Sequence, residues 1–399
     1  MFIIISILIF GLIIAVHELG HFIAAKTFRV GVPEFAIGMG PKLLKKQGKE
    51  TLYSLRAVPI GGFCALDGDD NDVAGDKSLF AKPLWQRLVI FLSGSLMNIA
   101  AGFLILFIIA AAIPALSTTT ATLSGLMDGF PLEGQQGFLP GDTFHRIDGL
   151  RVYQNSNIPM FLDMRTGDTV DIVVIRDGEQ VHLNNLPLER QLYPAYRQAL
   201  DADGAPLYDE NGEPILERMR TQVLDEYGEP LYEHGEPVYE DAYHYLFGFQ
   251  FERIEHPTVL NYLSFAFNNT RDFMRQLPLT VRMFATGQAG IQDVNSVVGI
   301  VDIMHQAGTT APTAADAALR LAMLAALISV SVAVVNLLPI PGLDGGRIFL
   351  MLVTTAIEKV TRRKVNPKFE TYINMAGLVL LLGLMIFVIF NDIVRIASR

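Results

Sequence analysis

Residues 14–22 of the chain read IAVHELGHF, and they lie inside an apolar run that extends from Phe2 to Ala25. A helix needs about 20 residues to span a bilayer, and this run is long enough. Ionisable side chains within such a helix are costly, and where they occur they usually serve a function. The sequence therefore predicts a membrane-spanning helix that carries reactive groups.

His17, Glu18 and His21 form an H-E-x-x-H pattern within this run. Residues four apart lie on one face of a helix, so both imidazoles can hold one zinc ion. Glu18 lies beside them and is the candidate general base for a water molecule that the metal makes more acidic. The alternative is an accidental match on a polar helix, and the apolar surroundings weigh against it.

The composition indicates a membrane protein. Hydrophobic residues make up 51% of the 399 residues and charged residues only 18%, whereas soluble domains usually carry about 25% charged residues. The single cysteine, Cys64, excludes an intramolecular disulfide and a cysteine-based metal site. We expect a polytopic α-helical membrane protein with about four transmembrane helices, at Phe2–Ala25, Leu88–Ile113, Leu319–Ile340 and Ile373–Phe390.

The distribution of charge predicts the orientation. Residues 26–87 carry 10 Lys and Arg, whereas residues 114–320 carry 13 Arg, no Lys and 29 acidic residues. The positive-inside rule then places the first loop in the cytoplasm and the acidic segment outside. The overall net charge of −10 argues against a nucleic-acid partner, which requires a basic surface.

A third metal ligand is expected, because a catalytic zinc takes three protein ligands and keeps one open position. Two prolines and three glycines interrupt the third apolar stretch at residues 336–346, which read NLLPIPGLDGG. Irregular backbone at membrane depth is tolerated only where it is buried in protein or lines a polar cavity. Asp344 in this break is the candidate ligand, and a turn-capping aspartate is the alternative.

These motifs resemble those of the site-2 protease family of intramembrane zinc metalloproteases, in its bacterial RseP-like branch with a single PDZ domain. His17–His21 match the family's H-E-x-x-H, and Asn336–Gly346 match its N-x-x-P-x-P-x-L-D-G, whose aspartate completes the zinc site. Phe80–Asn98 resembles the segment that enters the second span. The resemblance implies that Asn98 binds the substrate backbone, although Ser95 replaces the family's proline.

The first domain, residues 1–113, is expected to contain two spans and a β-rich cytoplasmic loop between them. Glycines punctuate the loop at Ile37–Asp69, and the family resemblance implies a membrane-associated β-hairpin region here. A substrate helix must become extended before attack, and an added strand would replace its hydrogen bonds. Gly61 and Gly62 are therefore the candidate substrate-binding residues of this region, and an ordinary glycine-rich loop is the alternative.

The acidic segment is expected to begin with an extracytoplasmic β-rich PDZ-like domain at residues 114–190. Its features are the run Gly137–Asp142, a hairpin turn at Asp177-Gly178 and a short helix at Asn157–Arg165. A peptide can add to a PDZ domain as a strand, and here the domain is expected to act mainly as a steric gate. A β-rich spacer without a peptide groove is the alternative.

Three further segments complete the chain. Residues 191–256 contain four copies of a weak G-x-P pattern and are expected to form an acidic insertion of short hairpins or a flexible arm. Residues 257–317 are amphipathic, which predicts helices on the membrane surface or, equally, ordinary packing helices. A strand at Tyr245–Glu252 is expected to rejoin the PDZ-like domain, and residues 318–399 are expected to hold the last two spans.

The resulting hypothesis is a zinc endopeptidase that cuts transmembrane segments of single-span membrane proteins. By resemblance, an upstream site-1 protease shortens these substrates first, and they are anti-sigma factors or remnant signal peptides. The expected location is the bacterial inner membrane, with the active site toward the cytoplasm. A catalytically silent scaffold and a metal transporter are the rival hypotheses, and the intact Glu18 and the few polar residues in spans two and four argue against them.

Overall fold

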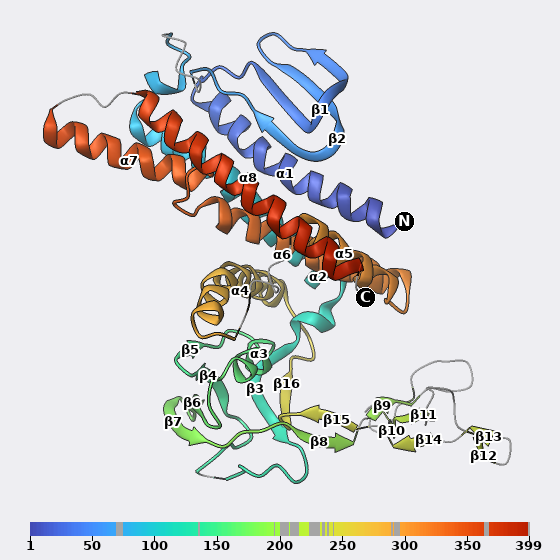
Figure 1. Ribbon diagram of the computed structural model, residues 1–399. Coiled ribbons are helices and arrows are strands. Elements are labelled where there is room, and N and C mark those ends of the chain that lie inside the picture. The colour runs from blue at the N-terminus through green and yellow to red at the C-terminus, as the bar shows by residue number, and fades with distance from the viewer. Residues whose placement is uncertain are drawn as a thin grey trace. The chain divides into compact units, whose positions relative to one another are not determined.

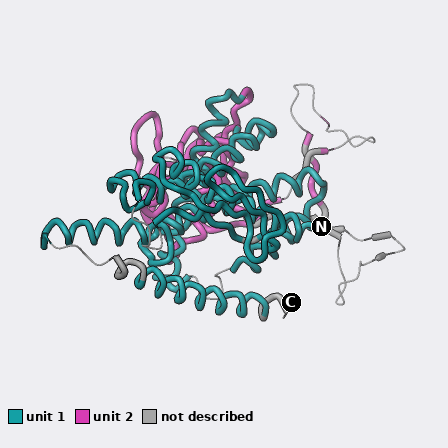
Figure 2. Tube along the Cα trace, turned by 90° about the horizontal axis from the view of Figure 1, so that it is seen from above, with its two compact units in different colours: residues 1–117, 257–399 teal, residues 118–256 magenta. Residues whose placement is uncertain are grey.

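The chain divides into two compact units in the computed structural model (Figures 1 and 2). We call Met1–Ser117 with Pro257–Arg399 the membrane unit, and Thr118–His256 the inserted unit. The structure describes residues 1–68, 75–134, 136–194, 196–199, 207, 215–222, 232–233, 236–237, 239–241, 243–288, 290, 296–362 and 367–397.

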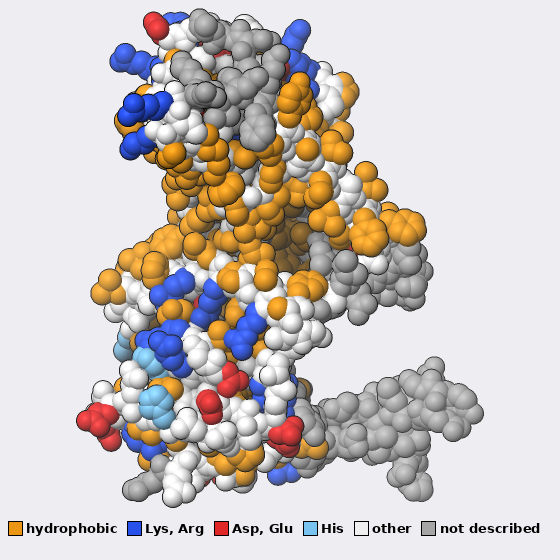
Figure 3. Space-filling view, turned by 60° about the vertical axis from the view of Figure 1, so that its left-hand side comes forward, with side chains coloured by type: hydrophobic (Ala, Val, Ile, Leu, Met, Phe, Trp, Pro, Cys, Tyr) orange, Lys and Arg blue, Asp and Glu red, His pale blue; other side chains and the backbone are white. Residues whose placement is uncertain are grey.

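The described part of the membrane unit is mainly helical. Its helices are α1 (Phe2–Thr27), α2 (Leu84–Ala112), α4 (Val259–Ala285), α5 (Val297–Thr309), α6 (Ala314–Asn336), α7 (Asp344–Thr361) and α8 (Pro367–Ala397). Four helices are long and apolar enough to cross a membrane, namely α1, α2, α6 and Tyr372–Ile393 of α8. Figure 3 shows hydrophobic side chains over these helices. The four predicted spans are confirmed in number, and the chain is a multi-pass membrane protein.

The third span lies slightly earlier than the sequence predicted. The side chain of Thr313 caps the first turn of α6 by accepting a hydrogen bond from the backbone N–H of Asp316, so the helix begins before Leu319. It ends at Asn336, because Pro339 and Pro341 cannot donate the hydrogen bonds that would continue it. The apolar stretch to Ile340 therefore runs one turn past the helix, whereas the predicted break at residues 336–346 is confirmed.

Small residues allow α1, α2 and α6 to pack closely. A Cβ on Gly20 would lie 2.3 Å from the carbonyl oxygen of Ser93 in α2. A Cβ on Gly102 would lie 2.6 Å from Cγ2 of Val330 in α6. Close backbone approach of this kind is common between helices in membranes, where packing rather than water exclusion drives association.

The first loop folds into β1 (Glu34–Gln47) and β2 (Leu52–Cys64), and each strand bends. Gly38 and Gly40 adopt positive φ angles of 84° and 83° at the bend of β1. The central segments pair in parallel and the outer pairings are antiparallel, so the region is more than the expected hairpin. Across the sheet, the order of the segments is 44–47, 52–55, 34–37 and 62–64.

Helix α4 corresponds to the predicted amphipathic segment. One face contacts α2 and α6, where Ala266 packs in a buried cluster with Leu106 and Ala326. Val259, Leu260 and Phe267 remain exposed. The prediction of packing helices is confirmed for this face, and contact with a membrane surface stays a prediction.

The inserted unit is built around one sheet. Its strands are β3 (Thr119–Leu126), β4 (Thr143–Ile147), β5 (Leu150–Arg151), β6 (Val170–Arg176), β7 (Glu179–Leu186) and β16 (Phe249–Arg253). The order is β16-β3-β4-β6-β7, with β5 beside β4. The predicted hairpin at Asp177-Gly178 joins β6 and β7, and the predicted short helix is α3 (Asn157–Asp163). The inserted unit has an aromatic core, formed by Phe130, Phe138, Phe144 and Phe249.

The remaining described strands of the inserted unit form short pairs. These are β8 (Gln191–Pro194) with β15 (Tyr243–Leu246), β9 (Tyr196–Gln198) with β10 (Leu216–Arg218), β11 (Arg220–Gln222) with β14 (Tyr239–Asp241), and β12 (Tyr232–Glu233) with β13 (Glu236–Pro237). The predicted strand at Tyr245–Glu252 is two strands, because Gly248 has a positive φ of 83° between β15 and β16. β16 does rejoin the sheet, beside β3. The G-x-P copies lie largely outside the described residues.

Candidate active site

Three side chains from α1 and from the start of α7 converge on one point. The Nε2 atoms of His17 and His21 lie 3.1 Å apart. Oδ2 of Asp344 lies 3.0 Å from Nε2 of His17 and 3.2 Å from Nε2 of His21. Among the described residues, these three form the one group of His, Cys, Asp or Glu side chains arranged to hold a metal ion.

The donor set fits a zinc ion. Ligand atoms bonded at about 2.0–2.1 Å in a tetrahedral arrangement lie roughly 3.3 Å apart, close to the separations found here. Nδ1 of His21 lies 2.8 Å from the carbonyl oxygen of Ile90, so it carries a proton and donates. Nε2 of His21 therefore keeps its lone pair for a metal. Three ligand atoms leave one position of a tetrahedron open for a reactant.

The non-helical turn between α6 and α7 positions Asp344. Gly342 has a φ of 96°, a conformation that side chains rarely adopt. A Cβ on Gly345 would lie 2.3 Å from the carbonyl oxygen of Leu337, and one on Gly346 would lie 2.1 Å from that of Ile340. The glycines therefore let the first turn of α7 fold tightly against the break, which brings Asp344 to the histidines on α1.

Two residues of the site were not assigned a role from the sequence. Gly94 on α2 faces both histidines, and a Cβ there would lie 2.4 Å from Nε2 of His21. Nδ2 of Asn336, the last residue of α6, lies 3.4 Å from Nε2 of His17. Both positions belong to the motifs that carried the family resemblance, and that was the available signal. Their role depends on which helices meet, which local sequence does not state.

Glu18 lies beside the metal-ligand cluster, next to the sheet of the first loop. It is partly exposed, and its carboxylate accepts a hydrogen bond from the backbone N–H of Cys64 in β2. A Cβ on Gly62 would lie 3.5 Å from Cγ of Glu18. The structure therefore brings the last segment of β2 to the candidate general base. A Cβ on Gly61 would instead meet Met39 of β1, 2.9 Å from its Cγ, so Gly61 is not brought to Glu18 in this way.

Asn98 lies one turn beyond Gly94 on α2 and is fully buried. Its backbone oxygen accepts a hydrogen bond from Oγ of Ser329, at 2.9 Å. Neither its amide nitrogen nor its amide oxygen has a hydrogen-bond partner in the described structure, and the same holds for Oγ of buried Ser95. Buried polar groups are normally paired, so these atoms need partners that the described residues do not supply.

Three side chains arranged to hold a metal ion, with an adjacent glutamate and set among membrane-spanning helices, are typical of membrane-embedded metallopeptidases. The family model described as "Peptidase family M50" matches residues 5–384. The chain therefore belongs to peptidase family M50, the site-2 protease family, and it is a zinc metalloprotease.

Similar proteins span nearly the whole length of the chain. A protein of Clostridium perfringens named as a zinc metalloprotease is 30% identical over 99% of this chain and 99% of its own length. One of Clostridium acetobutylicum with the same kind of name is 31% identical over 98% of this chain and 97% of its own. The metalloprotease MmpA of Caulobacter vibrioides is 27% identical over 97% of this chain and 94% of its own length.

Proposed function

We propose that the chain hydrolyses peptide bonds within membrane segments, with zinc held by His17, His21 and Asp344. The observation that carries this proposal is the convergence of three candidate ligand atoms within 3.2 Å of one another, two from the spanning helix α1 and one from the start of α7. Membrane depth restricts the reaction to substrates that themselves enter the bilayer. The proposed substrate is therefore a transmembrane segment rather than a soluble peptide.

Bound at this site, zinc would polarise a carbonyl group and make a water molecule more acidic. Glu18 would take the proton from that water and pass it to the leaving amine. The hydrogen bond from the Cys64 N–H would hold one carboxylate oxygen of Glu18 in place while the other is used. The unpaired amide of Asn98 would donate to a substrate carbonyl and accept from a substrate N–H.

The outermost segment of the sheet, residues 62–64, would supply the substrate's replacement hydrogen bonds. A helix hides its scissile carbonyl in an internal hydrogen bond, so the segment must be extended before attack. Gly62 brings this strand segment close to Glu18 without a side chain between them. A substrate paired along residues 62–64 would therefore lie next to the general base, whereas Gly61 would contribute through the bend beside Met39.

The proposed substrates are single-span proteins that an upstream site-1 protease has shortened, such as anti-sigma factors or remnant signal peptides. Two features support this proposal, the family membership and the acidic inserted unit between α2 and α4. The excess of Lys and Arg in the first loop supports a bacterial inner-membrane location with that loop in the cytoplasm. The inserted unit, which we propose is a single PDZ-like domain with an acidic insertion, would then be extracytoplasmic and would exclude bulky substrates.

The test of the reaction is Glu18→Gln in the purified full chain. Loss of a general base lowers turnover by about 10²- to 10⁴-fold, and zinc content should stay at one ion per chain. Glu50→Gln is the matched control, because Glu50 is an exposed glutamate of the first loop that pairs with Lys26 and Lys77. Normal cleavage by Glu18→Gln would refute the general-base role. Zinc transport into liposomes without cleavage would support a transporter instead.

The test of size exclusion is deletion of residues 120–252 with a short Gly/Ser linker. The deletion variant should cut an untrimmed single-span substrate that the full chain refuses, and both should cut the trimmed form. Zinc content and cleavage of the trimmed substrate report whether the variant is folded. A folded variant that still refuses the untrimmed substrate would refute exclusion by the inserted unit.

A further inference from the structure

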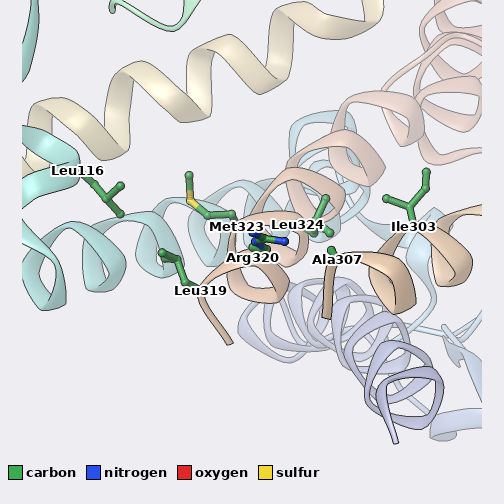
Figure 4. Close-up of a pocket in the computed structure, with 7 residues that line it drawn as sticks. All are labelled: Leu116, Ile303, Ala307, Leu319, Arg320, Met323 and Leu324. Carbon is green, nitrogen blue, oxygen red and sulfur yellow. The ribbon is translucent and has the colours of Figure 1, made fainter. Parts of the chain in front are cut away.

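An open groove of about 420 Å³ lies in the membrane unit, away from the metal-ligand cluster (Figure 4). It is formed by η2 (Pro114–Ser117), the short helical turn after α2, together with α5 and α6. Arg320 is the one charged residue among those that line it, and it contributes apolar atoms of its side chain to the lining. The apolar side chains that line it are Leu116, Ile303, Ala307, Leu319, Met323 and Leu324.

The groove lies at the end of the helix bundle opposite the metal-ligand cluster. Arg320 precedes Asn336 by 16 residues of α6, which is roughly 24 Å along a helix. Asn336 contacts His17, so the catalytic residues lie at the far end of α6. At the groove end, a Cβ on Gly308 of α5 would meet the ring of Phe2 at the start of α1.

Helix α5 connects the ends of several spans at this level. Its first turn is capped by Asp392, near the end of α8, which accepts hydrogen bonds from the backbone N–H groups of Ser296 and Gly299. Its last turn leads directly into α6. The ends of spans lie near the lipid headgroups, so α5 and the groove beside it lie at the boundary between acyl chains and headgroups.

Arg320 is the one Lys or Arg between positions 296 and 346 of the sequence. Its side chain is exposed, and Nη1 donates to Oγ1 of Thr310 at 3.2 Å. Acidic side chains on the same two helices are already engaged. Asp316 accepts from Thr313 at the start of α6, and Asp302 accepts from Gln306 on α5. Among the described residues no carboxylate pairs with Arg320, so its charge is available to an anion.

We propose that this groove binds an anionic glycerophospholipid, with an acyl chain against the apolar residues and the headgroup phosphate on Arg320. An arginine matches a phosphate with two parallel N–H donors, and a volume of 420 Å³ lies within the range of ligand sites. A zwitterionic lipid also carries a phosphate, but its headgroup ammonium cancels the net charge, so an anionic lipid gains more from Arg320. A substrate's scissile bond lies roughly 24 Å away along α6, so catalysis does not require the groove to hold substrate.

Native mass spectrometry of the full chain tests the proposal. The protein is mixed with equal amounts of phosphatidylglycerol and phosphatidylcholine that carry the same acyl chains. The wild type should retain phosphatidylglycerol preferentially. Arg320→Gln should lower phosphatidylglycerol binding roughly fivefold and remove the preference, since one basic residue near an anionic headgroup contributes about that much. Ala307→Phe fills the groove and should lower binding of both lipids.

Control variants distinguish the effect of the Arg320 charge from an effect of any exposed arginine and from misfolding. Arg320→Lys keeps the charge and should retain most of the preference. Arg282→Gln removes an exposed arginine of α4 outside the groove and should change nothing. Zinc content and cleavage of a membrane substrate show that each variant is folded. The proposal is overturned if folded Arg320→Gln keeps the preference, if Ala307→Phe binds lipid normally, or if glycerol 3-phosphate alone binds as tightly as the lipid.

Discussion

Asp142 in the inserted unit is fully buried and Asp344 in the membrane unit is partly buried, and each lies beside a glycine, yet their surroundings differ. The carboxylate of Asp142 accepts hydrogen bonds from Nε and Nη2 of Arg176, each at 2.7 Å, and from the backbone N–H of Leu139, at 2.9 Å. Asp344 faces the Nε2 atoms of His17 and His21. The first carboxylate is surrounded by donors, whereas the second faces two ring nitrogens that can carry lone pairs.

This difference distinguishes a structural carboxylate from the candidate metal ligand. A buried charge is tolerated when its partners supply opposite charge and hydrogen bonds, as Arg176 does for Asp142. His21 already donates from Nδ1 to Ile90, so its Nε2 has no proton to give to Asp344 in the neutral ring. A cation between the three atoms would satisfy all of them. The geometry of the cluster therefore fits a bound metal better than a set of direct hydrogen bonds.

The largest expected effect comes from Asp344→Ala. Loss of an outer partner of a metal ligand typically costs 10- to 100-fold in affinity, so loss of a direct ligand should cost at least about 100-fold. Zinc analysis of the purified variant and cleavage of a membrane substrate should both show the loss. Asp142→Ala is the matched control and should retain zinc. Full zinc occupancy in Asp344→Ala would mean that Asp344 only caps a turn.

The next effect belongs to Asp142. Removal of one partner of a buried ion pair leaves the other charge uncompensated and costs about 3–5 kcal/mol. Asp142→Ala should therefore destabilise the inserted unit by up to that amount, since partly exposed Arg176 keeps its hydrogen bond to the carbonyl oxygen of Gly137. Limited proteolysis within residues 118–256 at increasing denaturant would measure it. Equal protection of variant and wild type would show that the pair contributes little.

The sequence was sufficient to predict the four spans, because each is a long apolar run. It also identified the candidate ligands, since H-E-x-x-H places His17 and His21 on one helix face. Local sequence alone could not separate Asp344 from Asp142, because both lie next to glycine in Pro/Gly-rich turns. The helical break at membrane depth and the family motif selected Asp344. Its assignment as a zinc ligand stays a prediction until zinc is measured.

Features that depend on which segments meet could not be predicted. The strand segment at residues 34–37 pairs with both halves of β2, in parallel with one and antiparallel with the other, and no local pattern encodes that choice. The space opposite His21 requires a residue without a Cβ on α2, but which glycine supplies it depends on the register of two helices. The same reason explains why Arg320 could not be linked to a groove from sequence.

Gly94→Ala is expected to have a smaller effect than the loss of a carboxylate. An added methyl group would lie 2.4 Å from Nε2 of His21, so the imidazole or α2 must move. Overpacking of this kind costs about 1–3 kcal/mol, and the part that displaces the imidazole should lower zinc affinity by roughly 5-fold or more. Gly102→Ala is the matched control, because its methyl group would meet Val330 and not the ligands.

Competition with a chelator would measure zinc affinity for both glycine variants. Gly94→Ala should release zinc more readily than wild type, and Gly102→Ala should lower helix-packing stability with unchanged zinc affinity. Equal zinc affinity in all three proteins would show that α2 adjusts without disturbing the histidines. That outcome would weaken the conclusion that Gly94 is part of the site.

The smallest expected effect is that of Glu34→Gln on the free energy of unfolding. Glu34 is a carboxylate near the surface, so it extends the comparison beyond Asp142 and Asp344. Burial raises the pKa of Glu34, but hydrogen bonds from Ser54 and Arg56 and the ion pair with Lys42 outweigh burial and lower the pKa from 4.5 to about 2. A carboxyl whose pKa is lower in the folded state contributes stability above its unfolded pKa. That contribution is lost as the pH falls from about 4.5 toward 2.

Glu34→Gln should therefore lower the free energy of unfolding by about 1 kcal/mol at pH 7, because solvent screens partners that lie near the surface. The gap between variant and wild type should shrink as the pH falls below about 4.5 and should nearly vanish close to pH 2. Unfolding midpoints of both proteins across this range would measure it, and other acidic groups cancel in the difference. A gap that stays constant with pH would show that Glu34 stabilises the sheet through hydrogen bonding that does not depend on its charge. Glu34 would then differ in kind from Asp142, whose contribution depends on a full charge facing Arg176.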